Sequence, residues 1–324
     1  MNVLVTGAGG FVGINIVYHL LKEGYDVFGL DVEPLESSEL DYLGEYRDNF
    51  ELITADVTNL SEIEEKFHAK DIHRIVHAAA LTSPGLSELD RFTALSQVNL
   101  LGTSNMLEFS RSLSNLDSFL YVSSASVYGN TREDTLIDET FPLKGKGAYS
   151  ITKEASEHLT HRYRNLYDID TSVVRLGWVY GPMERKTGSR QNMSLIYQIF
   201  DLMDKGVDIT INNTEAVRDW VHAMDVARAI VKVLDKPNRR FNTYNISSGE
   251  PYSISRIFEL IRRNFPDLRY EKVEDGSTEI QVNTDNRRGA LDITRLRDDV
   301  AYSPKYGIED GLYSYGKWFE QWRE

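Results

Sequence analysis

Strand-like and helix-like segments alternate through the first half of this 324-residue chain, and this alternation constrains the fold more than any other feature. The strand-like segments are short runs of β-branched and apolar residues, whereas the segments between them carry apolar residues at helical spacing. The expected strands are residues 2–6, 26–30, 50–55, 74–78, 118–123 and 171–176, and the expected helices are residues 12–23, 61–68, 89–113 and 149–167. Such alternation predicts an α/β fold with a doubly wound parallel sheet, whose ligands bind at the carboxyl ends of the strands.

The alternation becomes less regular after about Gly177, where the sequence is richer in glycine and charged residues. A helix is expected at residues 194–205, followed by a further strand and a helix that ends near residue 234. We therefore predict a Rossmann domain and a smaller, discontinuous C-terminal substrate-binding region. The predicted boundaries are 1–176 and 218–247 for the Rossmann domain, and 177–217 and 248–324 for the substrate-binding region.

Three glycines, Gly7, Gly10 and Gly13, lie between the first expected strand and the first expected helix. Glycine allows a tight turn and a close approach of a ligand to the bare backbone. The helix that follows offers unpaired N–H groups and a partial positive charge at its N-terminus. This arrangement is typical of a site for the pyrophosphate of a dinucleotide.

Two acidic residues follow the second and third expected strands. Asp31 is placed to accept hydrogen bonds from an adenosine ribose and to repel a 2′-phosphate, which favours NAD over NADP. Asp56 has two interpretations: it contacts the adenine edge, or it caps the helix that follows.

Tyr149 and Lys153 are four residues apart on an expected helix, so their side chains share one face. A free phenol has a pKa of about 10. A nearby cation stabilises the phenolate, and it would bring the phenol into the range of acid/base catalysis. Upstream, Ser124 and Ser126 end a buried strand, where a hydroxyl either donates to a substrate oxygen or satisfies the backbone of the turn.

Composition excludes several classes of protein. Lys and Arg number 36 against 50 Asp and Glu, and the net charge of −14 argues against a nucleic-acid partner. The chain has no cysteine, and its histidines form no recognisable metal set, so we expect no metal. Neither a membrane span nor a signal peptide is evident, and we expect a cytoplasmic protein with no membrane partner.

Seven motifs occur in an order and at spacings that resemble the extended short-chain dehydrogenase/reductase family, the group of NAD-dependent epimerases and dehydratases. They are TGxxGxxG at 6–13, Asp31, Asp56, VNxxGT at 98–103, SSxxVYG at 123–129, YxxxK at 149–153 and RDWVH at 218–222. The resemblance covers residues 1 to about 235. In this family the phenol is the acid/base group, which implies that role for Tyr149.

The resemblance implies further roles by position. Lys153 would be the electrostatic partner of the phenol and a ribose ligand, and Ser124 would donate to the substrate oxygen. Asn99 would lie near the active site, with a direct catalytic role or a backbone hydrogen bond as the two alternatives. The implied cofactor contacts are Gly7, Gly10, Phe11, Val12, Gly13, Asp31, Asp56, Val57, Ala78, Ala79, Tyr149 and Lys153. The implied substrate contacts are Ser124, Ser126, Arg185, Arg190, Arg218 and Arg288.

The arginines have simpler interpretations as well. Arg218 stands where the epimerases contact substrate phosphate, and its alternative is a surface salt bridge. For Arg185, Arg190 and Arg288 the alternative is an ordinary solvated side chain. Trp178 departs from the family pattern, because many nucleotide-sugar enzymes have a substrate-holding Asn there.

The motifs predict a small-molecule enzyme, and its reaction has two main interpretations. The first is a nucleotide-sugar 4-epimerase, closest to enzymes of UDP-hexoses, that transfers hydride transiently to NAD. The alternative is an NAD-dependent dehydrogenase of a sugar, sugar acid or polyol. A dehydratase is disfavoured because Ala125 and Ser126 replace its Asp-Glu pair, and Tyr149 and Lys153 argue against a non-enzymatic scaffold. The family also implies a homodimer, through the helices at residues 89–113 and 149–167.

Overall fold

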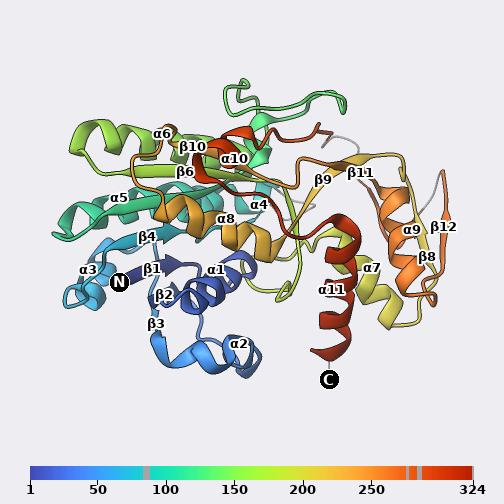
Figure 1. The fold of residues 1–324 in the computed structure, drawn as a ribbon, viewed down its shortest axis with the longest axis horizontal. Coiled ribbons are helices and arrows are strands. Elements are labelled where there is room, and N and C mark those ends of the chain that lie inside the picture. The colour runs from blue at the N-terminus through green and yellow to red at the C-terminus, as the bar shows by residue number, and fades with distance from the viewer. Residues whose placement is uncertain (83–87, 275–276, 283–286, 323–324) are drawn as a thin grey trace.

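A seven-stranded parallel sheet forms the centre of the computed structural model, which describes residues 1–82, 88–274, 277–282 and 287–322 (Figure 1). The strands run in the order β10-β6-β5-β4-β1-β2-β3, so the direction of winding reverses between β1 and β4. Their bounds are β1 (Asn2–Thr6), β2 (Asp26–Asp31), β3 (Phe50–Thr54), β4 (Arg74–His77), β5 (Ser118–Ser124), β6 (Thr171–Leu176) and β10 (Thr243–Ile246). The predicted α/β, doubly wound parallel sheet is confirmed.

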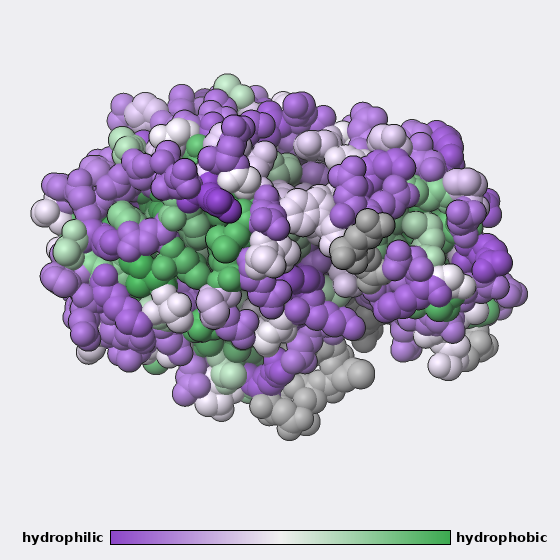
Figure 2. Space-filling view, turned by 90° about the horizontal axis from the view of Figure 1, so that it is seen from below, coloured by the Kyte–Doolittle hydropathy of each residue, from purple (hydrophilic) through white to green (hydrophobic). Residues whose placement is uncertain are grey.

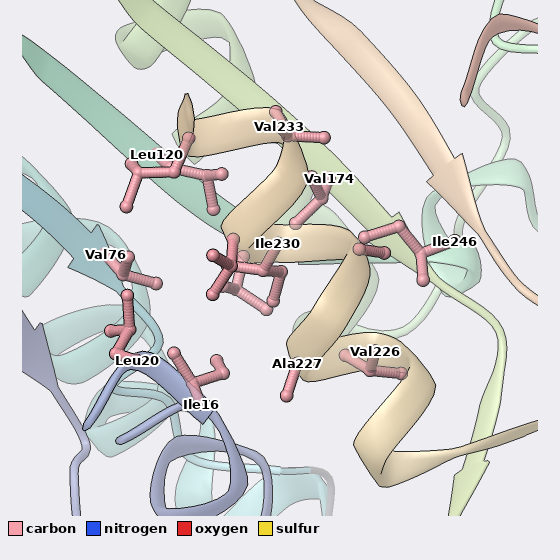
Figure 3. Close-up of a cluster of buried hydrophobic side chains, with 14 of the residues drawn as sticks. Ile16, Leu20, Val76, Leu120, Val174, Val226, Ala227, Ile230, Val233 and Ile246 are labelled. Carbon is pink, nitrogen blue, oxygen red and sulfur yellow. The ribbon is translucent and has the colours of Figure 1, made fainter. Parts of the chain in front are cut away.

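Helices cover both faces of this sheet. One face carries α1 (Phe11–Lys22), α8 (Ala223–Asp235) and α10 (Thr294–Val300), and the other carries α3 (Leu60–Phe67), α5 (Gly102–Ser112) and α6 (Ala148–Tyr167). Side chains alternate along each strand, so Val3 and Val5 pack with the first set of helices and Leu4 with the second. Figure 3 shows the packing of the first set of helices on the sheet, in which apolar residues of α1 and α8 meet those of β4, β5, β6 and β10.

The helix expected at residues 89–113 is a continuous helical run with three parts. These parts are α4 (Glu88–Leu95), the π-helical segment η2 (Ser96–Leu101) and α5. The sequence pattern does not reveal the π-helical middle part. It also does not predict α2 (Ser37–Leu43) or the 3₁₀ segments η1 (Gly44–Asn49) and η3 (Ala125–Tyr128).

The rest of the chain builds two small sheets and a separate apolar cluster. One sheet contains β7 (Trp178–Tyr180), β9 (Val217–His222) and β11 (Pro251–Ser253), and the other contains β8 (Ile209–Ile211) and β12 (Tyr270–Lys272). The cluster is formed by α7 (Leu195–Asp204), α9 (Ile254–Asn264) and α11 (Ile308–Gln321). Helix α7 begins where the sequence predicts it, because the Ser194 hydroxyl accepts a hydrogen bond from the Tyr197 N–H and caps it.

The surface seen from below is largely hydrophilic, which agrees with the charged composition. Figure 2 shows that the hydrophobic area of this face gathers on the left, over the half that holds the seven-stranded sheet. Among the described residues, no helix has both the length and the apolar character that a membrane span requires.

Candidate active site

A cavity of about 1120 Å³ lies at the carboxyl ends of the sheet strands, beside the point where the winding reverses. This volume exceeds the roughly 300–1,000 Å³ that is usual for a pocket with one ligand, so the cavity has room for two ligands side by side. The predicted site residues in its lining are Gly7, Gly10, Phe11, Val12, Gly13, Asp31, Asp56, Val57, Ala78, Ala79, Ser124, Ser126, Tyr149, Lys153, Arg185, Arg190 and Arg288. Two predicted residues, Asn99 and Arg218, do not line it.

The glycine bend, residues 7–13, fits a dinucleotide pyrophosphate. Gly7 has a φ of +66°, and a Cβ atom there would lie 2.8 Å from the Cα of Ala79. A Cβ atom on Gly13 would lie 1.9 Å from the Gly7 carbonyl oxygen, so α1 packs against the bend only because this side chain is missing. Gly10 precedes α1, whose first turn has neither a side-chain cap nor an acidic residue. The N–H groups at the helix start therefore face the cavity with their partial positive charge uncompensated by the protein.

Asp31 lies at the end of β2 and is fixed by two backbone N–H groups. Its Oδ2 accepts a hydrogen bond from the Gly9 N–H at 2.9 Å, and its Oδ1 accepts one from the Val32 N–H at 2.8 Å. The carboxylate is thus held at the edge of the cavity, where it suits a ribose and disfavours a 2′-phosphate.

Asp56 lines the cavity but does not cap α3. Its Oδ1 accepts a hydrogen bond from the Thr58 N–H at 2.8 Å, whereas the cap is Asn59, whose side chain accepts from the Glu62 N–H at 3.3 Å. The capping alternative for Asp56 is therefore wrong, because the helix begins three residues later than that interpretation requires.

Tyr149, Lys153 and Ser124 come together where β5 ends and α6 begins. A hydrogen bond joins the Tyr149 phenol to Ser124, and both residues line the cavity. Lys153 lies one helical turn further on, with its Nζ 5.9 Å from the centre of the Tyr149 ring. That Nζ donates a hydrogen bond to the Val122 carbonyl oxygen at 2.8 Å, which fixes the ammonium beneath the phenol.

Burial dominates the ionisation of this cluster. It raises the pKa of the Tyr149 phenol, although the hydrogen bond from Ser124 and the charge of Arg190 both lower it. Burial also lowers the pKa of Lys153 to about 7, against the opposing effect of the Glu157 carboxylate. Burial therefore outweighs the opposing charge of Arg190, and the pKa of the phenol lies above its usual value, against the direction expected from the Tyr149–Lys153 pair.

Asn99 forms hydrogen bonds with the backbone, as the second of its two interpretations expects. Its Oδ1 accepts from the Leu81 N–H at 2.8 Å, and its Nδ2 donates to the Leu81 carbonyl oxygen at 3.1 Å. The Asn99 carbonyl oxygen lies in the π-helical segment and accepts hydrogen bonds from the Ser156 and Thr103 hydroxyls. Asn99 thereby ties the segment after β4 to helix α6.

Arg218 and Arg288 are two cations that lie close enough for their charges to interact. Arg218 is only 4 % exposed, so the alternative of a surface salt bridge is wrong, and its guanidinium lies 5.0 Å from the centre of the Trp178 ring. Arg288 lines the cavity and donates to the Gly129 carbonyl oxygen at 3.1 Å. Burial lowers the pKa of Arg288 to about 10, and the charge of Arg218 contributes to this shift.

Arg185 is half-buried and contacts the glycine bend. Its Nη2 donates to the Gly9 carbonyl oxygen at 3.2 Å, and its guanidinium forms an ion pair with Glu39 of α2. Glu39 was not predicted as a site residue. Its one local signal is the pairing Glu36-x-x-Glu39, a capping box that marks the start of α2.

Arg190 lies on the other side of the same loop. It forms an ion pair of 2.5 Å with Glu184, and its guanidinium lies 5.1 Å from the centre of the Phe11 ring. Neither Arg185 nor Arg190 is thus an ordinary solvated side chain, and both contact residues of the cofactor half.

Several lining residues are not predicted from the sequence. They follow β4, or they lie in or after β7, and are Ala80, Leu81, Thr82, Trp178, Val179, Thr187, Ser189, Asn192, Met193 and Ser194. Only Trp178 carries a signal, as a departure from the family pattern. The others have no local motif, because the fold brings them to the cavity from distant parts of the chain.

Comparisons with known proteins agree with this geometry. The NAD dependent epimerase/dehydratase family matches residues 3–247. A UDP-glucuronate 4-epimerase of Thermodesulfobacterium geofontis is 29 % identical over 332 residues, which cover 98 % of this chain and 96 % of that protein. The crystal structure of a UDP-glucuronic acid 4-epimerase from Bacillus cereus in complex with NAD has a TM-score of 0.81 and 25 % identity, with all of both chains covered.

A UDP-glucose 4-epimerase from Thermotoga maritima has the same fold, with a TM-score of 0.84 at 23 % identity over the whole of both chains. The resemblance found in the motifs is confirmed, since the matched family spans well over half of the chain and is described as NAD dependent. The glycine bend and Asp31 fit that cofactor. This chain is therefore an extended short-chain dehydrogenase/reductase enzyme that uses NAD, and it belongs to the NAD dependent epimerase/dehydratase family.

Proposed function

We propose that this protein is a nucleotide-sugar 4-epimerase acting on UDP-hexoses, with UDP-glucose and UDP-glucuronate as the first substrates to test. The observation that carries the proposal is that one cavity is lined by the glycine bend, the Tyr149–Ser124 pair and Arg288 together. A cofactor, a sugar hydroxyl and a phosphate group therefore share one space. The names of the T. geofontis and B. cereus relatives support a UDP-sugar as substrate and position 4 as the reacting carbon.

The proposed chemistry needs no net oxidation. NAD supplies the group that accepts a hydride from the sugar carbon and returns it to the opposite face. Tyr149 takes the proton of the sugar hydroxyl and gives it back to the same oxygen, while the Ser124 hydroxyl holds that oxygen. Hydride and proton both return to the sugar, so the product differs from the substrate only in configuration.

The phosphate end of the substrate needs a strong anchor, because the oxidised sugar must turn without leaving. Arg288 borders the cavity, and Arg218 lies close enough to influence its ionisation. Guanidinium groups bind phosphate oxygens through paired, charge-assisted hydrogen bonds. We therefore assign the diphosphate to this end of the cavity, with Arg288 as its nearest cation.

The alternative is an NAD-dependent dehydrogenase of a sugar, sugar acid or polyol. The observation in its favour is Trp178, which lines the cavity where many nucleotide-sugar enzymes place an Asn. An indole N–H donates one hydrogen bond and accepts none, so it does not reproduce the contacts of an amide.

One experiment separates these functions. The protein is incubated with NAD and, in separate reactions, with UDP-glucose, with UDP-glucuronate, and with a panel of free sugars, sugar acids and polyols. The products are separated by chromatography, and absorbance at 340 nm is followed. A 4-epimerase forms the epimer without a net rise in absorbance. A rise with free sugars, sugar acids or polyols and no epimer supports the dehydrogenase, and cofactor binding without turnover contradicts both.

We also propose the division at residues 1–176 and 218–247 against 177–217 and 248–324, supported by the separate apolar cluster of α7, α9 and α11. Helix α10 falls in the second part by this division but packs on the main sheet. A homodimer is part of the proposal. Phe92, Leu101 and Ile151 are 54 %, 46 % and 48 % exposed on α4, η2 and α6, the helices expected at the interface. Sedimentation tests the homodimer, since Ile151→Glu should shift the protein to a monomer.

A cytoplasmic location completes the proposal, because a chain without cysteine needs no oxidising compartment.

A further inference from the structure

The segment of residues 184–190, called the strap here, crosses from β7 to the cofactor half of the cavity. It contacts three segments that each follow a strand of the main sheet. Arg185 donates to the Gly9 carbonyl oxygen in the glycine bend, and the Ser189 carbonyl oxygen accepts from the N–H and the hydroxyl of Thr82 after β4, both at 3.2 Å. A Cβ atom built on Gly188 would lie 3.5 Å from the Glu33 carboxylate, so the strap also runs along the segment after β2.

The base of the strap is fixed. Glu184 is 2 % exposed, and it accepts hydrogen bonds from the N–H and the hydroxyl of Ser194, both at 2.6 Å. It also forms the 2.5 Å ion pair with Arg190. Both ends of the strap are therefore attached to the N-terminus of α7, and its position over the cavity is defined.

Gly9 is held from two sides at the point where the strap meets the bend. Its N–H donates to Asp31 at 2.9 Å, and its carbonyl oxygen accepts from Arg185 at 3.2 Å. Arg185 reaches this position while paired with Glu39, whose side chain is fully buried. Glu39 is itself oriented by the Glu36 N–H, which donates to its Oε2 at 2.6 Å.

We infer that Arg185 and Glu39 are positioning residues that fasten the strap to the glycine bend and keep the cofactor on the protein between turnovers. The inference rests on the proposed function, because an epimerase uses the same cofactor for both hydride transfers. A dehydrogenase that works by net oxidation must release its reduced cofactor in every turnover. Breaking a buried, charge-assisted pair is slow and costly, so the pair opposes release.

The test measures the dissociation of the cofactor, not catalysis. The protein is loaded with NADH and mixed with an excess of NAD, and the loss of bound-NADH fluorescence gives the dissociation rate. Glu39→Gln keeps the size of the side chain and removes its charge, and Arg185→Gln removes the charge and leaves a shorter polar side chain. We expect each to dissociate NADH about ten- to hundredfold faster, the range that corresponds to one charged hydrogen bond. The double variant should be no faster than the faster single one, because the two residues act as a unit.

A matched control breaks an ion pair elsewhere. Glu309→Gln removes the 2.7 Å pair between Arg263 of α9 and Glu309 of α11 and should leave the rate unchanged. Arg185→Lys keeps the positive charge and should restore part of the slow release, which a merely structural role would not produce. It also gives a result if Arg185→Gln fails to fold.

The inference is overturned if both neutral variants release NADH within twofold of the unaltered protein, or no faster than the control does. No sugar is present, so this outcome is independent of the reaction. If the unaltered protein instead forms net NADH from sugar acids, the proposed epimerase is wrong, and the strap is still judged by its own dissociation rates.

Discussion

The glycine bend with Asp31 represents the cofactor half of the cavity, and Arg288 represents the substrate half. Contacts of different separation along the sequence hold these two parts. In the cofactor half, Gly9 is bonded to Asp31 over 22 residues, within one strand–helix–strand unit. In the substrate half, Arg288 is bonded to Gly129 over 159 residues. The link between the glycine bend and Asp31 follows from local backbone chemistry, whereas the contact of Arg288 exists only once the whole chain has folded. Substrate preference can therefore change within this fold while the cofactor site stays intact.

The largest effect is expected at the point where the two halves meet. Tyr149→Phe removes the hydroxyl that carries the proton and should lower turnover by about 10²–10⁴-fold, while NAD binding stays nearly unchanged. Turnover assays and an NAD titration measure both quantities. Tyr313→Phe, on an exposed residue of α11, is the matched control and should be silent. If Tyr149→Phe keeps more than about a tenth of the rate, Tyr149 is not the acid/base group.

A second comparison is made within the substrate half, between the effects of Arg288 and Arg218 on UDP-sugar binding. Arg288→Ala should weaken UDP-sugar binding by about 1.5–3 kcal/mol, because Arg288 borders the cavity and would lose a charged hydrogen bond. Arg218→Ala should have a smaller effect, since Arg218 lies against the Trp178 ring outside the lining. Calorimetric titration with UDP-sugar in the presence of NAD measures both. A larger loss in Arg218→Ala would mean that the diphosphate reaches past Trp178.

These halves also differ in how far the sequence predicts them. Six of the seven strands of the main sheet are predicted to within one residue, because runs of β-branched and apolar residues favour strands, whereas β10 (Thr243–Ile246) is not predicted. The glycine bend and Asp31 were found because a pyrophosphate and a ribose impose local requirements.

The strap is predicted only through Arg185 and Arg190, as substrate contacts, and its partner Glu39 is not predicted. Glu39 looks like a helix-capping residue of α2, and nothing near it shows that Arg185 lies against it in the fold. Similarly, β7 has only three residues and is not predicted. Its pairing with β9, in which Trp178 lies opposite Trp220, joins segments that are distant in the sequence. The direction of the shift in the Tyr149 pKa is not predicted for a related reason, because burial is a property of the folded chain and not of the motif.

In the cofactor half, a smaller effect is expected from Asp31→Ala. Loss of the carboxylate removes its repulsion of a 2′-phosphate, so the preference for NAD over NADP should narrow by about tenfold. The ratio of the dissociation constants of the two cofactors measures this. Asp31→Asn separates charge from position, since an amide oxygen can still accept from the Gly9 N–H. An unchanged ratio in both variants would remove Asp31 from the ribose site.

The last effect concerns the pH dependence of stability at Lys153. Burial lowers the pKa of this residue from 10.5 to about 7 in the folded protein. Below pH 7 both the folded and the unfolded chain hold the proton, so Lys153 makes no pH-dependent contribution. Between pH 7 and 10 the folded chain has lost the proton and the unfolded chain retains it, so the free energy of unfolding rises with pH.

Lys153→Met removes this term. The free energy of unfolding of the unaltered protein, minus that of the variant, should therefore stay constant from pH 6 to 7 and increase from pH 7 to 9. The slope is at most about 1.4 kcal/mol per pH unit, the value for one proton. Urea denaturation without cofactor, at pH 6, 7, 8 and 9, gives the difference directly. Parallel pH profiles would show that the ammonium keeps its proton beneath the phenol, so that Lys153 stays charged through the range in which Tyr149 works.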